Sequence, residues 1–245
     1  MAIRAAGSYV SKSKGARKGR KQLKENRFNK LKFFNLTSKL FPVTNHGTTS
    51  HPKVRSRQDL NPFLVGRTFK VNQGDLESAN PADAHNSPRY FKFKVNKVQG
   101  NDCCSVFDGM EMTRDKVAGL IRKWHTLITY SNEITTKDGS TWRVFVNAVT
   151  KRKSESSLKH YAKASEVKEI RKSIDETIQK NLNNVEVEKL VKLLSTDTVV
   201  REVETNAAKI YPVNAMITKV KAVKNMQCIV RKEEKEEENE FKEEL

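Results

Sequence analysis

The sequence has few of the features by which secreted, membrane-spanning and metal-binding proteins are recognised. Its 245 residues include three cysteines, Cys103, Cys104 and Cys228, and their spacing fits no metal-ligand pattern. The odd number predicts no disulfide framework, so reduced thiols in a cytosolic protein fit best. No segment is apolar and long enough to cross a bilayer, and the basic N-terminus lacks the apolar stretch of a secretory signal. We therefore expect no membrane partner.

The motifs of the common enzyme classes are missing as well. The sequence contains neither a phosphate-binding loop nor a dinucleotide fingerprint. Its five histidines are scattered, and His46 and His51 share a loop without an acidic or cysteine partner that would complete a zinc site. Turn and helix-cap roles account for Asp108 and Asp115. We expect no catalytic residues, no metal, no cofactor and no small-molecule substrate.

Aromatic residues make up only 7% of the chain, and most of them fall in patterns that are typical of a buried core. Modules that bind single-stranded nucleic acid by base stacking display several aromatic side chains on one surface. The composition therefore argues against such a module.

Acidic residues are too few to balance the basic ones. Forty-seven Lys and Arg residues stand against 29 Asp and Glu residues, which gives a formal net charge of +18. Self-repulsion of this size destabilises a compact protein, and a polyanionic partner removes that cost. Nucleic acid is the commonest such partner, and an anionic membrane surface is the second. Because 36% of the residues are hydrophobic, the chain can still bury a core.

The two ends of the chain carry opposite charge. Residues 1–32 hold eleven Lys and Arg residues against one Glu, with too few apolar residues to offset the entropy of ordering, which predicts a disordered arm. A solubilising or nuclear-import role is compatible with phosphate binding by this arm. Residues 231–245 hold eight Glu residues against four basic ones, which is typical of a solvated end. The expected phosphate-binding residues of the arm are Lys12, Lys14, Arg17, Lys18, Arg20, Lys21, Lys24, Arg27, Lys30 and Lys32.

The first half of the remaining sequence predicts strands followed by one helix. Residues 33–109 are strand-like and turn-rich, with apolar and polar residues alternating from Phe91 to Val95. Thr113 is a good helix N-cap. Val117, Leu120, Ile121 and Trp124 then recur at helical spacing and form one apolar face. On this pattern we expect Trp124 to be buried in the core.

The second half predicts a hairpin, several helices and a last strand. Residues 126–136 and 141–149 flank an Asp-Gly turn, the strongest short hairpin signal in the chain. Residues 160–210 show helical periodicity, and Asn183 with Glu186 makes a candidate capping box for the second helix of this section. Residues 213–223 revert to a strand pattern that returns to the sheet. The expected fold is α+β, with a mainly antiparallel sheet that can curl into a barrel, in a single domain over residues 33–230.

Basic clusters recur at the ends of these expected elements. Lys151, Arg152 and Lys153 follow the hairpin, whereas Arg171 and Lys172 lie on the polar side of the first long helix. Arg55 and Arg57 lie in a loop. Each cluster alone is as consistent with a solvated charge run as with phosphate binding. Their recurrence, together with the basic arm, favours phosphate contacts, and we predict that the hairpin end and the helix form one patch.

Several motifs, in order, resemble one ribosomal protein family of eukaryotes and archaea, the small-subunit family eS-one, formerly S-three-a. The resemblance covers roughly residues 60–224. It departs at residues 33–34, where two Phe residues stand in place of a usual Trp-Tyr pair, and at the acidic tail. The matching motifs are Val98-Gln99-Gly100-Asn101, Phe107-Asp108-Gly109-Met110, Thr113-Arg114-Asp115-Lys116, Lys123-Trp124, Thr135-Thr136-Lys137-Asp138-Gly139, Thr150-Lys151-Arg152-Lys153, Tyr161-Ala162, Ile170-Arg171-Lys172 and Ile210-Tyr211-Pro212.

The resemblance implies a non-enzymatic structural constituent of the small (40S) subunit. It implies a place on the platform near the mRNA exit side, with small-subunit ribosomal RNA and neighbouring ribosomal proteins as partners. It also implies a cytoplasmic location on the ribosome, after passage through the nucleus and nucleolus during assembly. Two other hypotheses are a free RNA- or DNA-binding regulator and an RNA-modifying enzyme. The first requires a compact sequence-reading element and the second a cofactor loop or convergent acid and base residues.

Overall fold

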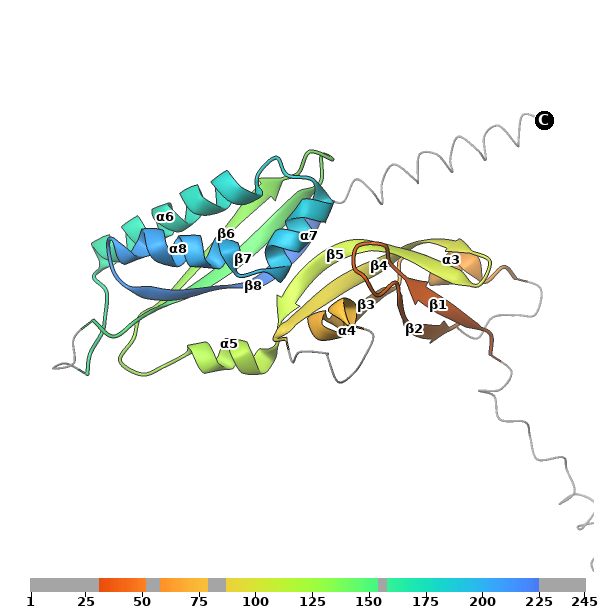
Figure 1. Cartoon of the computed structure of the whole chain (residues 1–245), viewed down its shortest axis with the longest axis horizontal. Helices are drawn as coiled ribbons and strands as arrows, with labels where there is room; N and C mark the ends of the chain where they lie inside the picture. The colour runs from red at the N-terminus through yellow and green to blue at the C-terminus, as the bar shows by residue number, and fades with distance from the viewer. Residues whose placement is uncertain (1–30, 52–57, 79–86, 154–157, 225–245) are drawn as a thin grey trace, which may run out of the picture.

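The computed structural model of the chain describes residues 31–51, 58–78, 87–153 and 158–224. Their elements form an elongated α+β structure with helices packed on an antiparallel-rich, mixed sheet (Figure 1). The strands are β1 (Phe33–Thr37), β2 (Asn45–Ser50), β3 (Thr68–Asn72), β4 (Arg89–Gln99), β5 (Asp102–Met112), β6 (Leu127–Thr135), β7 (Thr141–Thr150) and β8 (Val213–Lys224). The helices are α3 (Asn61–Leu64), α4 (Gln73–Glu77), α5 (Arg114–Leu120), α6 (Ala164–Leu182), α7 (Val187–Ser195) and α8 (Thr198–Ala208).

The last strand joins the two parts of the sheet. The strand order is β2-β1-β5-β8-β7-β6, with β4 and β3 continuing from the other edge of β5. Strand β8 pairs with β7 along its whole length, but with β5 only from Lys219 to Lys221. The expectations of a hairpin across the Asp-Gly turn and of a returning final strand are confirmed.

The sheet does not close, so the expectation that it curls into a barrel is corrected. Strand β5 pairs with β4, with β1 and with β8 along different stretches of its length, so the sheet branches there. Strands β2 and β6 stand at opposite ends of the strand order and have no pairing with each other among the described residues. The pairing with β1 is parallel, which makes the sheet mixed.

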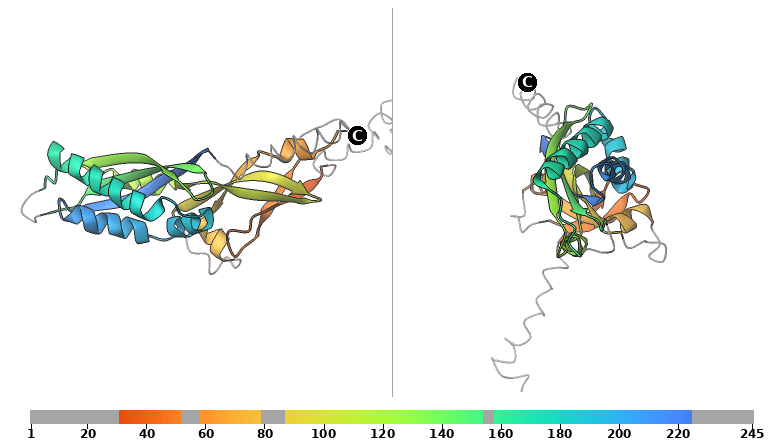
Figure 2. Two further views of the ribbon diagram at one scale, coloured as in Figure 1. Left: turned by 90° about the horizontal axis from the view of Figure 1, so that it is seen from above. Right: turned by 90° about the vertical axis from the view of Figure 1, so that its left-hand side faces the viewer.

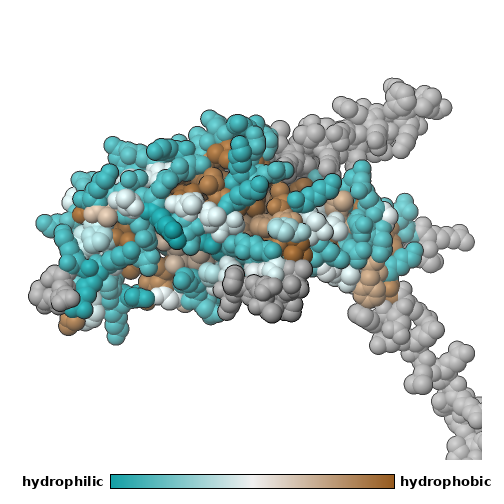
Figure 3. All heavy atoms as spheres, in the orientation of Figure 1, coloured by the Kyte–Doolittle hydropathy of each residue, from teal (hydrophilic) through white to brown (hydrophobic). Residues whose placement is uncertain are grey.

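The main core lies between the sheet and helices α6, α7 and α8. The alternating residues Trp142, Val144, Val146 and Ala148 of β7 point into it and are at most 2% exposed. Helix α6 contributes a buried stripe from Ile170 to Leu182, at the spacing that its sequence predicts. Figure 2 shows these helices along one side of β6, β7 and β8. The surface of that side is mainly hydrophilic over α6 and α8 (Figure 3).

Two smaller clusters complete the packing. One lies near β1 and α3 and includes Phe34, Leu64 and the buried thiol of Cys103. The neighbouring Cys104 is partly exposed, as alternation along a strand requires. The other cluster holds α5 against the end of β7 and β8, through Leu120, Val149 and Met216 among others.

The prediction that Trp124 is a core residue was wrong. Helix α5 ends at Leu120, and Ile121 is already extended and 69% exposed. Trp124 has a left-handed backbone (φ 68°), is 47% exposed and lies under the Lys159 ammonium group. Its carbonyl accepts a hydrogen bond from the His160 amide at 2.8 Å. Pairing of this segment with the chain before α6 therefore overrides the helical periodicity.

The capping box expected at Asn183 was also wrong. Asn183 is the residue that ends α6, and its side-chain oxygen accepts hydrogen bonds from the amide and hydroxyl of Thr135. Helix α7 starts one turn later, after Glu186. A capping interaction exists instead at α6, where Glu166 accepts a hydrogen bond from the Lys163 amide at 2.7 Å.

Candidate nucleic-acid interface

The basic cluster that follows β7 is held in place from two sides. The Lys151 amide donates to the Pro212 carbonyl at 2.7 Å, and its ammonium group lies 3.2 Å from a carboxylate oxygen of Glu204 on α8. The Lys153 ammonium group lies 5.3 Å from the centre of the Tyr211 ring. Lys151, Arg152 and Lys153 are all exposed. The cluster is therefore held in place while its side chains stay exposed to solvent.

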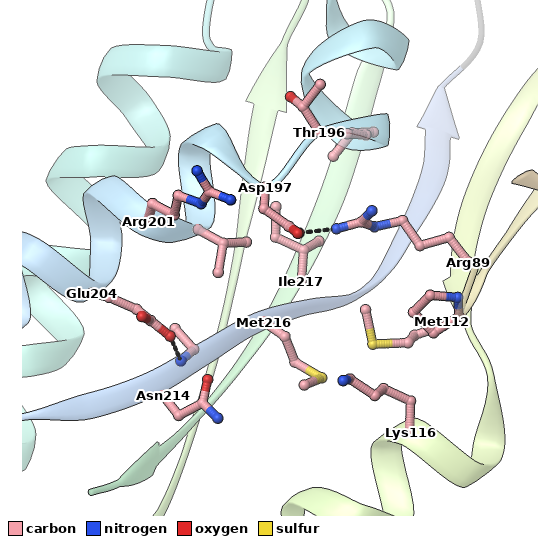
Figure 4. Close-up of a pocket in the computed structure, with 14 residues that line it drawn as sticks. Arg89, Met112, Lys116, Thr196, Asp197, Arg201, Glu204, Asn214, Met216 and Ile217 are labelled. Atoms are coloured by element: carbon pink, nitrogen blue, oxygen red, sulfur yellow. Dashed lines mark hydrogen bonds and ion pairs between the residues drawn. The ribbon is translucent and has the colours of Figure 1, made fainter. Parts of the chain in front are cut away.

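Lys151 and Arg152 line a groove beside α5. Two adjoining cavities of about 420 and 510 Å³ share Lys116, Asn214 and Met216 and together run between α5, α8 and the end of β8. Figure 4 shows the first cavity, with Lys116 and Arg201 on opposite sides of β8. The cationic side chains of the groove come from several elements, and they are Arg89, Lys116, Arg122, Lys151, Arg152 and Arg201.

The carboxylates of the groove are partly engaged by the protein itself. Asp197 forms an ion pair with Arg89. Glu204 accepts a hydrogen bond from the Ala215 amide at 3.0 Å, and it also pairs with Lys151. Ala215 pairs with β7 on one side, and the pairing of β8 with β5 on the other side is confined to Lys219–Lys221. By contrast, Lys116, Arg122 and Arg201 have no ion pair with any residue that the structure describes.

This arrangement suits an anionic group. Unpaired cations at a groove can bind phosphate, and Arg can do so with two parallel hydrogen bonds. The floor, formed by Met112, Met216 and Ile217, supplies apolar contact area. The described residues include no group of three or more His, Cys, Asp or Glu side chains that could hold a metal ion. None of their helices is long and apolar enough to cross a membrane.

The other predicted residues are placed as follows. Arg171 and Lys172 are exposed on α6, where Lys172 lies 4.0 Å from Glu176 one turn away, whereas the groove lies beside α5. That Arg171 and Lys172 form one basic patch with the hairpin end remains a prediction. Lys32 is exposed just before β1. The predicted residues outside the described ones are Lys12, Lys14, Arg17, Lys18, Arg20, Lys21, Lys24, Arg27, Lys30, Arg55 and Arg57.

Sequence reasoning missed Lys116, Arg122 and Arg201 as candidate binding residues. Lys116 and Arg122 lie off the apolar face of the α5 pattern, which is a weak signal. Arg201 carries no local signal, because only the packing of α8 beside β8 brings it to the groove.

The net charge of +18, the groove and the spread of cations over several elements are the features expected of one class, structural proteins that bind a polyanion. Comparison with known proteins then identifies the family. A family model described as the Ribosomal S3Ae family matches residues 19–226. The chain belongs to this family, and it is therefore a structural ribosomal protein and not an enzyme.

Two relatives have closely matching lengths, and both are named "Small ribosomal subunit protein eS1". The chain is 69% identical to the protein of Enterocytozoon bieneusi (strain H348) over 232 residues, which cover 95% of this chain and 92% of the relative. It is 37% identical to the protein of Encephalitozoon cuniculi (strain GB-M1) over 231 residues, which cover 93% and 94% of the two chains. The resemblance in the sequence motifs is thereby confirmed.

Proposed function

We propose that the chain is a constituent of the small (40S) ribosomal subunit that binds small-subunit ribosomal RNA and neighbouring ribosomal proteins. In this account it occupies the platform near the mRNA exit side, as the resemblance to its family implies. It supports subunit assembly, which includes passage through the nucleus and nucleolus, and translation in the cytoplasm. Family membership and the names of the two relatives support the ribosomal part of this proposal.

The observation that carries RNA binding is the groove beside α5, where Lys116, Arg122 and Arg201 have no ion pair among the described residues. A ribosomal protein contacts folded RNA mainly through phosphates. Cations without an ion pair inside the protein are the most available for such contacts. Lys151 and Arg152 at the groove, Arg171 and Lys172 on α6, and the basic arm are the further phosphate-binding residues of this proposal. We also propose the division into an arm over residues 1–32, one domain over residues 33–230 and an acidic tail.

The test replaces five cations by neutral residues of similar size, at Lys151, Arg152, Lys153, Arg171 and Lys172. These side chains are exposed, and surface substitutions usually change stability by less than about 0.5 kcal/mol each, so the variant is expected to fold. In competition with the unchanged chain it should enter small subunits poorly. Equal incorporation of the two chains would show that these five charges are merely solvated.

A matched variant separates the groove from general electrostatics. Lys180, Lys189 and Lys192 are exposed on α6 and α7, and they line neither of the two cavities. Replacing these three by Gln lowers the net charge by the same amount as replacing Lys116, Arg122 and Arg201 by Gln. We expect the groove variant to incorporate less well than the helix variant, and equal incorporation would remove the groove from the proposal.

A further inference from the structure

The face of the sheet opposite α6 and α8 carries a basic row that the sequence does not reveal. Residues that pair directly across strands lie on the same face of a sheet. The observed register joins Lys70, Lys92, Gly109, Lys221 and Arg143 in one row across β3, β4, β5, β8 and β7. Helix α5 covers the end of this face near Val149 and Met216. Lys70, Lys221 and Arg143 are exposed, and Lys92 is half-buried.

The dimensions of this row suit a polymer of phosphates. Neighbouring strands lie about 4.8 Å apart, so the row from Lys70 to Arg143 spans roughly 19 Å. The glycine in the middle leaves the centre of the row without a side chain. The cations nearest to the centre of the row are therefore Lys92 and Lys221, which flank Gly109 on β4 and β8.

The acidic residues on this face do not cancel its charge. Glu111 lies 2.6 Å from the Lys70 ammonium group and 3.2 Å from that of Lys219, and the hydrogen bond from Lys70 holds its pKa below the ordinary value. Glu133 pairs with Arg143. Asp108 lies beside Lys92 and Lys94, and burial raises its pKa. Among the described residues near the row, the cations Lys70, Lys92, Lys94, Lys219, Lys221 and Arg143 thus outnumber the carboxylates Asp108, Glu111 and Glu133.

Next to this row lies a hollow with an aromatic ring and unused hydrogen-bonding groups. It measures about 350 Å³, and Phe145, Asn147, Thr129, Ser131 and Lys219 contribute to its lining. The register places Phe145 directly between Ser131 and Lys219. The side chains of Thr129, Ser131 and Asn147 make no hydrogen bond with any residue that the structure describes.

A ring flanked by an amide, two hydroxyls and a lysine is the chemistry that recognises an unpaired nucleobase. The Lys221 ammonium group lies 5.7 Å from the centre of the Phe145 ring, where a base would take its place. The base then stacks on the ring, the amide and hydroxyls bond to its exposed edge, and the ammonium groups of Lys219 and Lys221 meet the phosphates. A second aromatic residue, Tyr90, is 37% exposed in the same row as Phe145, with Glu111 and Lys219 between them. A base-paired duplex could not offer a free base edge to this hollow.

We propose that this open sheet face binds an unpaired segment of RNA, with phosphates along the basic row and one base in the hollow at Phe145. The inference rests on the proposed function, since it identifies one RNA contact of a protein that binds ribosomal RNA. An acidic protein segment is the other polyanion that the row can attract, but its carboxylates would contact neither the Phe145 ring nor the free Asn147 amide in the way that a nucleobase does.

The test compares two double variants of the full chain, Lys92→Gln/Lys221→Gln on the open face and Lys189→Gln/Lys192→Gln on α7. Both lose two charges, so general attraction to RNA falls equally. Binding is measured with a fluorescent 12-nucleotide oligouridylate at several salt concentrations. Each phosphate contact on a single strand contributes a slope of about −0.7 to log K against log salt. The open-face variant should therefore flatten the slope by about 1.4, and the α7 variant should leave it unchanged.

Two single variants test the hollow and the acidic residues. Phe145→Leu removes the ring but keeps an apolar side chain, and it should weaken oligouridylate binding about five- to tenfold. Binding to a 12-base-pair RNA duplex should not change. Glu133→Gln frees Arg143 and should strengthen oligouridylate binding, a gain that a merely structural role does not predict. Thermal unfolding of each variant checks that the fold is kept.

The outcomes separate this inference from the proposed function. If the unchanged chain sediments with small subunits while the open-face variant and Phe145→Leu bind oligouridylate as the unchanged chain does, the open-face inference fails alone. Equal weakening of single-strand and duplex binding by Phe145→Leu would also overturn it. If the open-face variant binds oligouridylate normally but loses a synthetic poly-glutamate peptide, the occupant is an acidic protein segment. If the unchanged chain does not sediment with small subunits, the proposed function itself fails.

Discussion

Replacing Gly109 by Ala probes the junction that holds the two parts of the sheet together. Gly109 has a φ of +152°, which L side chains rarely adopt, and it pairs with Lys221 where β5 meets β8. A Cβ atom at this position would overlap the carbonyl oxygen of Val220. Because this oxygen belongs to the backbone, no side-chain rotation relieves the clash, and β8 must move away from β5.

The expected cost follows from two effects. A non-glycine residue in a sparsely populated backbone region costs about 1–3 kcal/mol, and overpacking against fixed atoms costs about 1–3 kcal/mol. Movement of β8 also weakens a junction of three register pairs, which is the link between β5 and β8 in the described sheet. We therefore expect Gly109→Ala to lower the free energy of unfolding by about 3–5 kcal/mol and Tm by about 10 °C.

The same substitution at Gly119 is the matched control. Gly119 lies within α5, and apart from its chain neighbours and the backbone of its own helix no described heavy atom lies within 4 Å of the position of a Cβ atom. Alanine is favoured over glycine in a helix by about 0.8–1 kcal/mol, so Gly119→Ala should raise stability slightly. Urea unfolding of the three proteins measures both effects. A Gly109→Ala protein within about 0.5 kcal/mol of the unchanged chain would refute the tight approach of β5 to β8.

Three further predictions concern stability and charge. Trp142→Ala should lower the free energy of unfolding by about 3–5 kcal/mol because Trp142 is 1% exposed, whereas Trp124→Ala should lower it by less than about 1 kcal/mol. Chemical denaturation of both variants measures these losses of stability, and equal losses would contradict the exposure of Trp124. Hydrogen bonds from Tyr130 and from Asn132 hold the pKa of Asp175 below its ordinary value, so its stabilisation should be present at neutral pH and be lost as pH falls below about 4. Asp175→Asn should remove this part of the pH dependence in unfolding measured from pH 7 to pH 3, and an unchanged profile would refute it. For six to ten phosphate contacts, log K for RNA binding should fall against log salt with a slope of roughly −4 to −9. Deleting residues 1–32 should make this slope less steep, and an unchanged slope would place the phosphate contacts elsewhere in the chain.

Local sequence patterns correctly predicted those elements whose tertiary contacts favour the same secondary structure as the pattern. The alternation from Phe91 to Val95, the Asp-Gly hairpin and the stripe of α6 from Ile170 to Ile178 each match the observed strand, turn and helix. In these cases one face meets the core and the other meets solvent, so periodicity alone carries the information.

The same reasoning failed where distant contacts decide the backbone. The period through Trp124 predicted a longer α5, but a bridge between His125 and His160 extends the chain there instead. The sheet branches at β5, where β1, β4 and β8 each pair with part of the strand, and it does not close. The residue pattern within one strand does not specify which strands pair with it. The basic row likewise depends on register, which joins residues as far apart as Lys70 and Arg143. The groove depends on the packing of α5 and α8 beside β8.

The most direct test of the central claim is sedimentation of the tagged chain with ribosomal particles. Cells that express it are lysed, and small subunits are separated on a sucrose gradient after a high-salt wash that removes loosely bound proteins. A structural constituent that contacts RNA over several elements should stay with the small-subunit fraction, in about one copy per particle. A chain that instead remains at the top of the gradient, at low salt as well as after the wash, would contradict the account.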